Sequence, residues 1–98
     1  MLIVKVLFFT SLREITEKKE EKVELTAMDN VTINKILEML KDRYGKPFVE
    51  YVYSPKTNKV RDFLQFLING KSISPPNVLM AILKDGDILA ILPPVGGG

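Results

Sequence analysis

The chain ends in Pro93-Pro94-Val95-Gly96-Gly97-Gly98, and this segment offers very little chemistry. Beyond Val95 it carries no side chain, so its one reactive group is the α-carboxylate of Gly98. A carboxylate is a poor acyl donor because of its charge, and it must become a mixed anhydride, ordinarily with ATP, before a nucleophile can displace it. Glycines fit narrow channels and adopt backbone angles that other residues avoid. The tail therefore predicts an acyl group that is presented to an activating enzyme.

The composition removes most other kinds of chemistry. The 98 residues include no Cys and no His, which excludes thiolate nucleophiles, disulfides, imidazole bases and the common transition-metal ligand sets. The formal charge is only +2, from 14 Lys and Arg against 12 Asp and Glu, and the two signs are interspersed. No segment has the length or pattern of a membrane span or a signal peptide. We expect a cytoplasmic protein that has no metal site, no nucleic-acid partner and no membrane partner, and that is not an enzyme on its own.

The tail needs a folded body that holds it. A turn at Asp85-Gly86-Asp87 precedes an apolar strand at residues 88–92, and Asp-Gly is favoured chemistry for such a turn. The two prolines that follow fix φ and cannot donate to a sheet ladder, so they end the strand and project the glycines. Six residues reach about 20 Å when extended. We therefore divide the chain into one domain at residues 1–92 and a flexible tail at residues 93–98.

The remaining elements predict an α+β fold. The clearest is a helix at residues 32–44, whose apolar residues form one stripe between a Thr32 cap and a Gly45 stop. Further expected segments are a strand at 2–9, a short helix at 11–15, an exposed turn at 17–22, a strand at 22–26, an extended segment at 48–53, an exposed excursion with a small hairpin at 54–59, and a strand at 63–68 that ends in an Asn69-Gly70 turn. Because the first and last strands are apolar on both faces, we place them side by side in the middle of a mixed sheet, with one main helix on one face. This layout resembles the β-grasp of ubiquitin-like proteins.

One face of that sheet is a candidate interface. If Lys5 and Gln65 point to water, then alternation along the strands places neighbouring apolar residues on the same outer face, away from the helix. An exposed apolar patch of this kind is typical of a partner surface. The predicted partner interface consists of Leu7, Phe9, Leu67 and Leu92.

The sequence resembles the MoaD family, the small sulfur-carrier subunits of molybdopterin synthase, over nearly its whole length. The matching residues are 4–9, Leu12-Arg13-Glu14, the helix beginning at Thr32, the Ile68-Asn69-Gly70 turn, and above all the Asp85-Gly86-Asp87 turn that leads through one strand into Pro-Pro-Val and the terminal glycines. In the family the residue before the last two glycines is often Ala. This chain has Gly96 there, which only loosens the tail.

The resemblance implies a cycle in which this chain is first a substrate and then a sulfur donor. A MoeB-like activating enzyme uses ATP and Mg²⁺ to adenylate the carboxylate of Gly98, and a persulfide donor then replaces AMP to leave a thiocarboxylate. A MoaE-like large subunit supplies the catalytic groups and passes the sulfur to precursor Z, the cyclic pyranopterin monophosphate, for the molybdenum or tungsten cofactor. The chain itself binds no cofactor in this scheme.

Other destinations remain open for the same tail. The chain is either a carrier for thiazole synthesis or tRNA thiolation, or a ubiquitin-like modifier joined through Gly98 to lysines, or a plain interaction module with a frayed end. Thiazole-synthesis carriers are usually shorter and lack residues 12–14 and the insertion at 46–62, so the length favours the MoaD resemblance.

Overall fold

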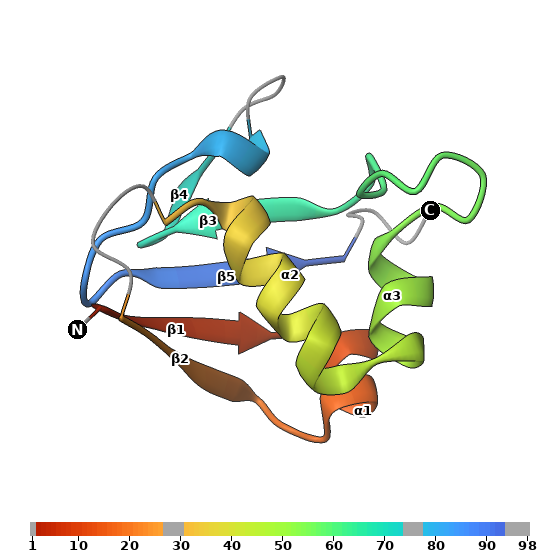
Figure 1. Cartoon of the computed structure of the whole chain (residues 1–98), viewed down its shortest axis with the longest axis horizontal. Helices are drawn as coiled ribbons and strands as arrows, with labels where there is room; N and C mark the ends of the chain where they lie inside the picture. The colour runs from red at the N-terminus through yellow and green to blue at the C-terminus, as the bar shows by residue number, and fades with distance from the viewer. Residues whose placement is uncertain (1, 27–30, 74–77, 94–98) are drawn as a thin grey trace.

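The computed structural model describes residues 2–26, 31–73 and 78–93 of the chain. Within these residues one five-stranded sheet carries helices on one of its faces (Figure 1). The strands are β1 Leu2–Phe8, β2 Glu20–Leu25, β3 Gln65–Ile68, β4 Lys71–Ser72 and β5 Ile88–Leu92, and the helices are α1 Ser11–Thr16, α2 Ile33–Tyr44, α3 Lys46–Val52 and the 3₁₀ helix η1 Val78–Met80.

The first and last strands lie together at the centre of the sheet, as the sequence predicts. The strand order is β2-β1-β5-β3-β4, and β1 and β5 run parallel with Lys5 opposite Ile88 and Phe8 opposite Ile91. The β1–β2, β3–β4 and β3–β5 pairs are antiparallel. With α2 crossing one face of this mixed sheet (Figure 1), the arrangement is the β-grasp fold.

The hydrophobic core lies between the sheet and α2. Alternate residues of β1 point inward, so that Val4, Val6 and Phe8 have no exposed surface. The apolar stripe of α2 packs against them and is equally buried at Ile33, Ile36, Leu37 and Leu40. Lys5 points outward and lies 3.6 Å from Glu20, which confirms the predicted assignment of the two faces of β1. A one-residue shift in pairing would reverse every one of these assignments.

The ends of α2 follow from local sequence. The hydroxyl of Thr32 accepts a hydrogen bond from the Lys35 backbone N–H at 3.1 Å, which is an N-terminal cap. At the other end Gly45 adopts a φ of 74°, a conformation that glycine takes readily.

Three segments differ from the sequence prediction, and the smallest difference is that β3 begins at Gln65, two residues after the predicted start at Phe63. Residues 48–53 were expected to be extended, but Lys46–Val52 forms α3, in which Phe48 and Val52 are buried four residues apart. The physical reason is Pro47, which ends a helix when it lies beyond its last turn but also suits the first turn of a new one. The charged run at 17–22 is also only partly a turn, because β2 already begins at Glu20. The predicted small hairpin is present as an antiparallel bridge between Tyr53 and Val60.

Candidate functional site

The candidate site begins where β5 leaves the sheet. Leu92 is the last residue of β5 and pairs with Gln65 of β3, and the half-buried Pro93 follows it. The predicted tail residues Pro94, Val95, Gly96, Gly97 and Gly98 lie outside the described residues. The described residues therefore end at Pro93, directly after a central strand that is paired on both sides.

The turn that starts β5 is fastened to β1. The Asp85 carboxylate accepts a hydrogen bond from the Ile3 N–H at 2.8 Å, and the Gly86 N–H donates to the Ile3 carbonyl at 2.8 Å. Gly86 has a φ of 88°, which L side chains rarely adopt. The second acid, Asp87, accepts from the Lys84 N–H at 2.8 Å and so closes the turn. These contacts fix the start of β5 against its parallel neighbour.

A second turn holds the same point from the other side. The amide of Asn69 donates to the Asp87 carboxylate at 2.9 Å, and its carbonyl oxygen accepts from the Ile88 N–H at 2.9 Å. Asn69 and Gly70 have φ angles of 51° and 84°, as expected of a tight hairpin turn. The two turns that the sequence singles out separately thus form one clasp at the start of β5. The sequence analysis missed this link, because nothing local connects residues that are 18 positions apart.

The outer face of the sheet carries apolar side chains beside β5. Leu7 of β1 and Leu67 of β3 lie opposite Ala90 on either side, and both are half-buried. We define the outer-face patch as the residues of this alternation, Leu7, Leu67, Ile88, Ala90 and Leu92. Ile88 is 37% exposed and was missed by the sequence analysis, although its spacing of two from Ala90 and four from Leu92 is a usable signal.

Phe9, the remaining predicted interface residue, lies just past the end of β1. It is half-buried, and the guanidinium of Arg13 lies 5.4 Å from the centre of its ring. Phe63 is more exposed, at 43%, and was not predicted; the guanidinium of Arg61 lies 5.8 Å from the centre of its ring. Two of the predicted interface residues, Leu7 and Leu67, therefore lie together beside Ala90. Phe9 instead packs against the guanidinium of Arg13.

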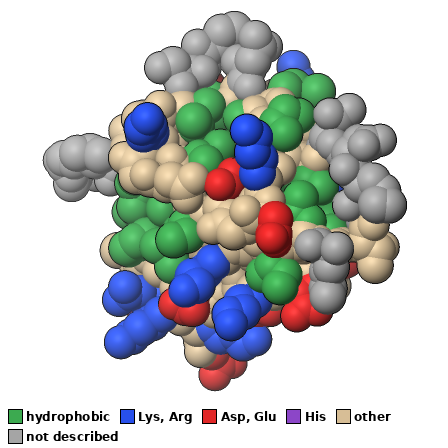
Figure 2. Space-filling model, turned by 90° about the vertical axis from the view of Figure 1, so that its left-hand side faces the viewer, with side chains coloured by type: hydrophobic (Ala, Val, Ile, Leu, Met, Phe, Trp, Pro, Cys, Tyr) green, Lys and Arg blue, Asp and Glu red, His purple; other side chains and the backbone are tan. Residues whose placement is uncertain are grey.

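The surface charges are mixed. Seen from the end at which β1 and β5 begin, Lys and Arg side chains lie among Asp, Glu and hydrophobic side chains (Figure 2). Charged β2 borders the apolar face, since Glu20 lies opposite Leu7 and Lys22 lies opposite Lys5. An interspersed border of this kind favours a protein partner of matching shape over a uniformly charged polymer.

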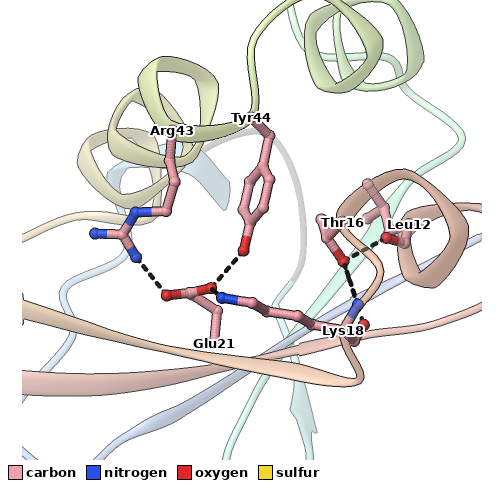
Figure 3. A network of polar contacts seen from close by, with 6 residues as sticks. All are labelled: Leu12, Thr16, Lys18, Glu21, Arg43 and Tyr44. Carbon is pink, nitrogen blue, oxygen red and sulfur yellow. Dashed lines mark hydrogen bonds and ion pairs between the residues drawn. The ribbon is translucent and has the colours of Figure 1, made fainter.

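One charged cluster is part of the framework. The Glu21 carboxylate on β2 accepts hydrogen bonds from Lys18, Arg43 and Tyr44, which ties the strand to the end of α2 (Figure 3). Burial raises the pKa of Glu21, but the hydrogen bonds from Lys18 and Tyr44 and the charges of Arg43 and Lys18 outweigh it and hold the pKa below its ordinary value. Burial, together with the hydrogen bond to Glu21 and its charge, raises the pKa of Tyr44 to about 12. Since donors already occupy this carboxylate, we assign it a stabilising role.

The described part of the chain shows no group of three Asp, Glu, Cys or His residues that could hold a metal ion. Across residues 2–26, 31–73 and 78–93, no helix combines the length and apolar character needed to cross a membrane.

Comparison with known proteins gives consistent matches. A model described as the ThiS family matches residues 6–98. The molybdopterin synthase sulfur carrier subunit of Drosophila yakuba is 34% identical over 96 residues, which cover 97% of this chain and 90% of that protein. The solution structure of small archaeal modifier protein 1 (SAMP1) from Methanosarcina acetivorans is 33% identical with a TM-score of 0.77, covering 100% of this chain and 98% of that one. A chain of the Amycolatopsis orientalis BexX/CysO complex is 30% identical with a TM-score of 0.70, covering 97% and 99%.

Proposed function

We propose that this chain, which belongs to the ThiS family and has a ubiquitin-like fold, is the small sulfur-carrier subunit of molybdopterin synthase and supplies no catalytic group of its own. The observation that carries the proposal is the end of β5. A strand clasped at its start and paired on both sides leads directly into a sequence whose one reactive group is the Gly98 carboxylate. The Drosophila yakuba sulfur carrier subunit is 34% identical over an alignment that covers 97% of this chain, which supports the same role.

The proposed cycle needs chemistry that other proteins supply. The Gly98 carboxylate attacks the α-phosphorus of ATP on an activating enzyme of the MoeB kind, with Mg²⁺, and pyrophosphate leaves. The terminal sulfur of a persulfide then attacks the acyl carbon and AMP leaves. A thiol cleaves the resulting acyl disulfide, so that the tail keeps one sulfur as thiocarboxylate while the donor and the thiol become a disulfide. This chain contributes the acyl carbon, held at high effective concentration by the docked domain.

The large subunit, of the MoaE kind, is the proposed recipient of the loaded chain. We place the outer-face patch and Phe9 against it, because an apolar surface next to the start of the tail orients the tail toward the acceptor. There the sulfur passes to precursor Z, and the carrier returns with a plain carboxylate. The cytoplasm, where ATP is available, is the proposed location of this cycle.

A second function is favoured by a specific comparison. The structure that is 33% identical over the whole of this chain is that of a small archaeal modifier protein. In this alternative the adenylated Gly98 is attacked by a lysine amine of another protein, and an isopeptide bond forms with release of AMP. The tail is equally suited to both fates because each begins with the same adenylate.

The intact mass of the chain tests both functions. The chain is incubated with the activating enzyme of its host, ATP, Mg²⁺ and a persulfide donor, and a variant that lacks Gly98 is the matched control. Replacement of one oxygen by one sulfur at the C-terminus, in the full-length chain alone, supports the carrier function, and subsequent conversion of precursor Z by the large subunit supports the molybdopterin role. A lysine conjugate without sulfur supports the modifier instead, and an unchanged mass refutes both.

A further inference from the structure

β2 is an outermost strand of the sheet, and its outward edge is unpaired in the described part of the chain. The strand order leaves β1 as its one neighbour, and Figure 1 draws no described element beyond it. β2 extends over Glu20–Leu25, whereas β4 at the opposite edge consists of Lys71–Ser72 alone. A free strand edge of this length is a template for pairing with another chain.

The hydrogen-bond pattern shows which backbone groups of β2 face outward. The Lys5 N–H donates to the Asp87 carbonyl at 3.0 Å, so the odd-numbered residues of β1 turn toward the β5 side. The Phe8 N–H donates to the Lys19 carbonyl at 2.9 Å, so the even-numbered residues of β1 bond with the odd-numbered residues of β2. The backbone N–H and carbonyl groups that point to the free edge are therefore those of Glu20, Lys22 and Glu24.

The side chains along this edge alternate in charge. Glu20, Lys22 and Glu24 are all exposed. Lys22 lies directly opposite Lys5 of β1, which is an unfavourable like-charge pair, and Lys5 itself lies 3.6 Å from Glu20. Among the described residues, neither Lys22 nor Glu24 takes part in an ion pair. A carboxylate on the outward side of Lys22 would therefore balance the charge of Lys5 on its other side.

This alternation fits a second copy of the same strand in one antiparallel register. Outward-facing residues must lie opposite outward-facing residues, so the allowed registers differ by steps of two residues. If Lys22 lies opposite Lys22 of the second copy, then Glu20 lies opposite Glu24 and all these pairs repel. If Lys22 lies opposite Glu24 of the second copy, residues 21–25 of both strands are paired, opposite charges meet on both sides of the two-fold axis, and Val23 lies opposite Val23. Further shifts in either direction leave fewer residues of β2 paired.

We propose that the chain forms a homodimer through the free edge of β2, with Lys22 of each copy paired with Glu24 of the other. The two sheets become one continuous sheet whose two-fold axis is perpendicular to it, so the α2 helices of both copies lie on the same face. Backbone hydrogen bonds between these residues hold the strands together, and the ion pairs select the register. Charged side chains commonly protect an edge strand from pairing, but here the alternation of sign makes the edge complementary to itself. The pairing does not involve β5 or the outer-face patch.

The association of the intact chain, measured by sedimentation equilibrium up to millimolar concentration, tests the proposal. A contact confined to one short strand is small beside the roughly 1,200 Å² of stable interfaces, so we expect a weak, reversible dimer. It should weaken at high salt, because salt screens exposed ion pairs. In the isotope-labelled chain, dilution should shift the amide signals of residues 20–26 most. A chain that stays monomeric at millimolar concentration, or shifts centred on the outer-face patch, would overturn the proposal.

Charge variants test the register. Lys22→Glu and Glu24→Lys each place like charges opposite each other and should each weaken the dimer by about 10-fold. A mixture of these two variants brings opposite charges together again at both positions and should associate about as tightly as the wild type. The control is Lys71→Glu, which makes the same change of charge at the other edge of the sheet and should leave the dimer unchanged. Equal weakening by Lys22→Glu and Lys71→Glu, or a mixture that associates no better than the single variants, would contradict the proposed pairing.

Discussion

Replacement of Glu21 by Gln is expected to show how strongly the cluster at the end of α2 stabilises the fold. The side chain of Glu21 is only 11% exposed and accepts three hydrogen bonds, from Lys18, Arg43 and Tyr44. An amide of the same shape carries no charge, and its NH₂ group must face other donors. Glu21→Gln therefore replaces charge-assisted hydrogen bonds by neutral or repulsive contacts.

The magnitude follows from the exposure of the partners. The Tyr44 bond is partly buried, and its weakening from a charge-assisted to a neutral hydrogen bond costs about 1 kcal/mol. The side chains of Lys18 and Arg43 are 53% and 42% exposed, so water screens both pairs and each loses about 0.5 kcal/mol. The sum is about 2 kcal/mol, which corresponds to a melting temperature lowered by roughly 8–16 °C in a domain of this size.

The assay is thermal unfolding followed by circular dichroism, at neutral pH and then at decreasing pH. The control is Glu24→Gln, which makes the same change of charge at an exposed position of the same strand. Because the folded pKa of Glu21 lies below its ordinary value of 4.5, its contribution is complete above that pH and is lost as the pH falls through the folded pKa. The difference between wild type and Glu21→Gln should therefore shrink in acid. If Glu21→Gln melts with the Glu24→Gln control at neutral pH, the stabilising role assigned to this cluster is wrong.

Three further predictions concern other parts of the molecule. Tyrosine in the unfolded chain ionises near pH 10, whereas the pKa of Tyr44 in the folded chain is about 12, so the free energy of unfolding of the wild type should fall as the pH rises between these values. Tyr44→Phe should remove this part of the alkaline loss of stability, and urea unfolding at a series of pH values would measure it. Asn69→Ala breaks both hydrogen bonds of the clasp to Asp87 and β5 and should lower the free energy of unfolding by about 1–2 kcal/mol, and an unchanged urea midpoint would contradict the clasp. If the proposed large subunit is the partner, Phe9→Lys and Leu67→Lys should each weaken binding to it by about 10-fold in calorimetric titration, at an unchanged melting temperature. A variant that unfolds instead would place its residue in the core.

The elements that depend on local signals were predictable from the sequence. Thr32 and Gly45 mark both ends of α2 because capping and a positive φ are properties of single residues and their neighbours. The central place of β1 and β5 followed from their apolar character on both faces. The prediction that residues 48–53 are extended was wrong because Pro47 can follow the end of one helix and also lie in the first turn of the next. The burial of Phe48 in the folded chain favours the second helix.

The parts that depend on distant contacts were not predictable in the same way. Glu21 belongs to a charged run that is expected to be solvated, and it is shielded only because the end of α2 lies above it. A groove beside the start of β3 is lined by residues that range from Asn34 of α2 to Leu79 of η1, so no local pattern in the sequence marks it. The tail residues of the candidate site remain a prediction from sequence, since Pro94 to Gly98 lie outside the described residues.

The central position of β5 also determines how the domain responds to mechanical force. A pull on the tail runs along the axis of β5, whose backbone hydrogen bonds to β1 and β3 lie across that axis. These bonds are loaded in shear and must break together, whereas a strand at the sheet edge pulled sideways would lose them one at a time. We therefore expect the domain to resist a force applied through the tail better than it would if the tail left from an edge strand.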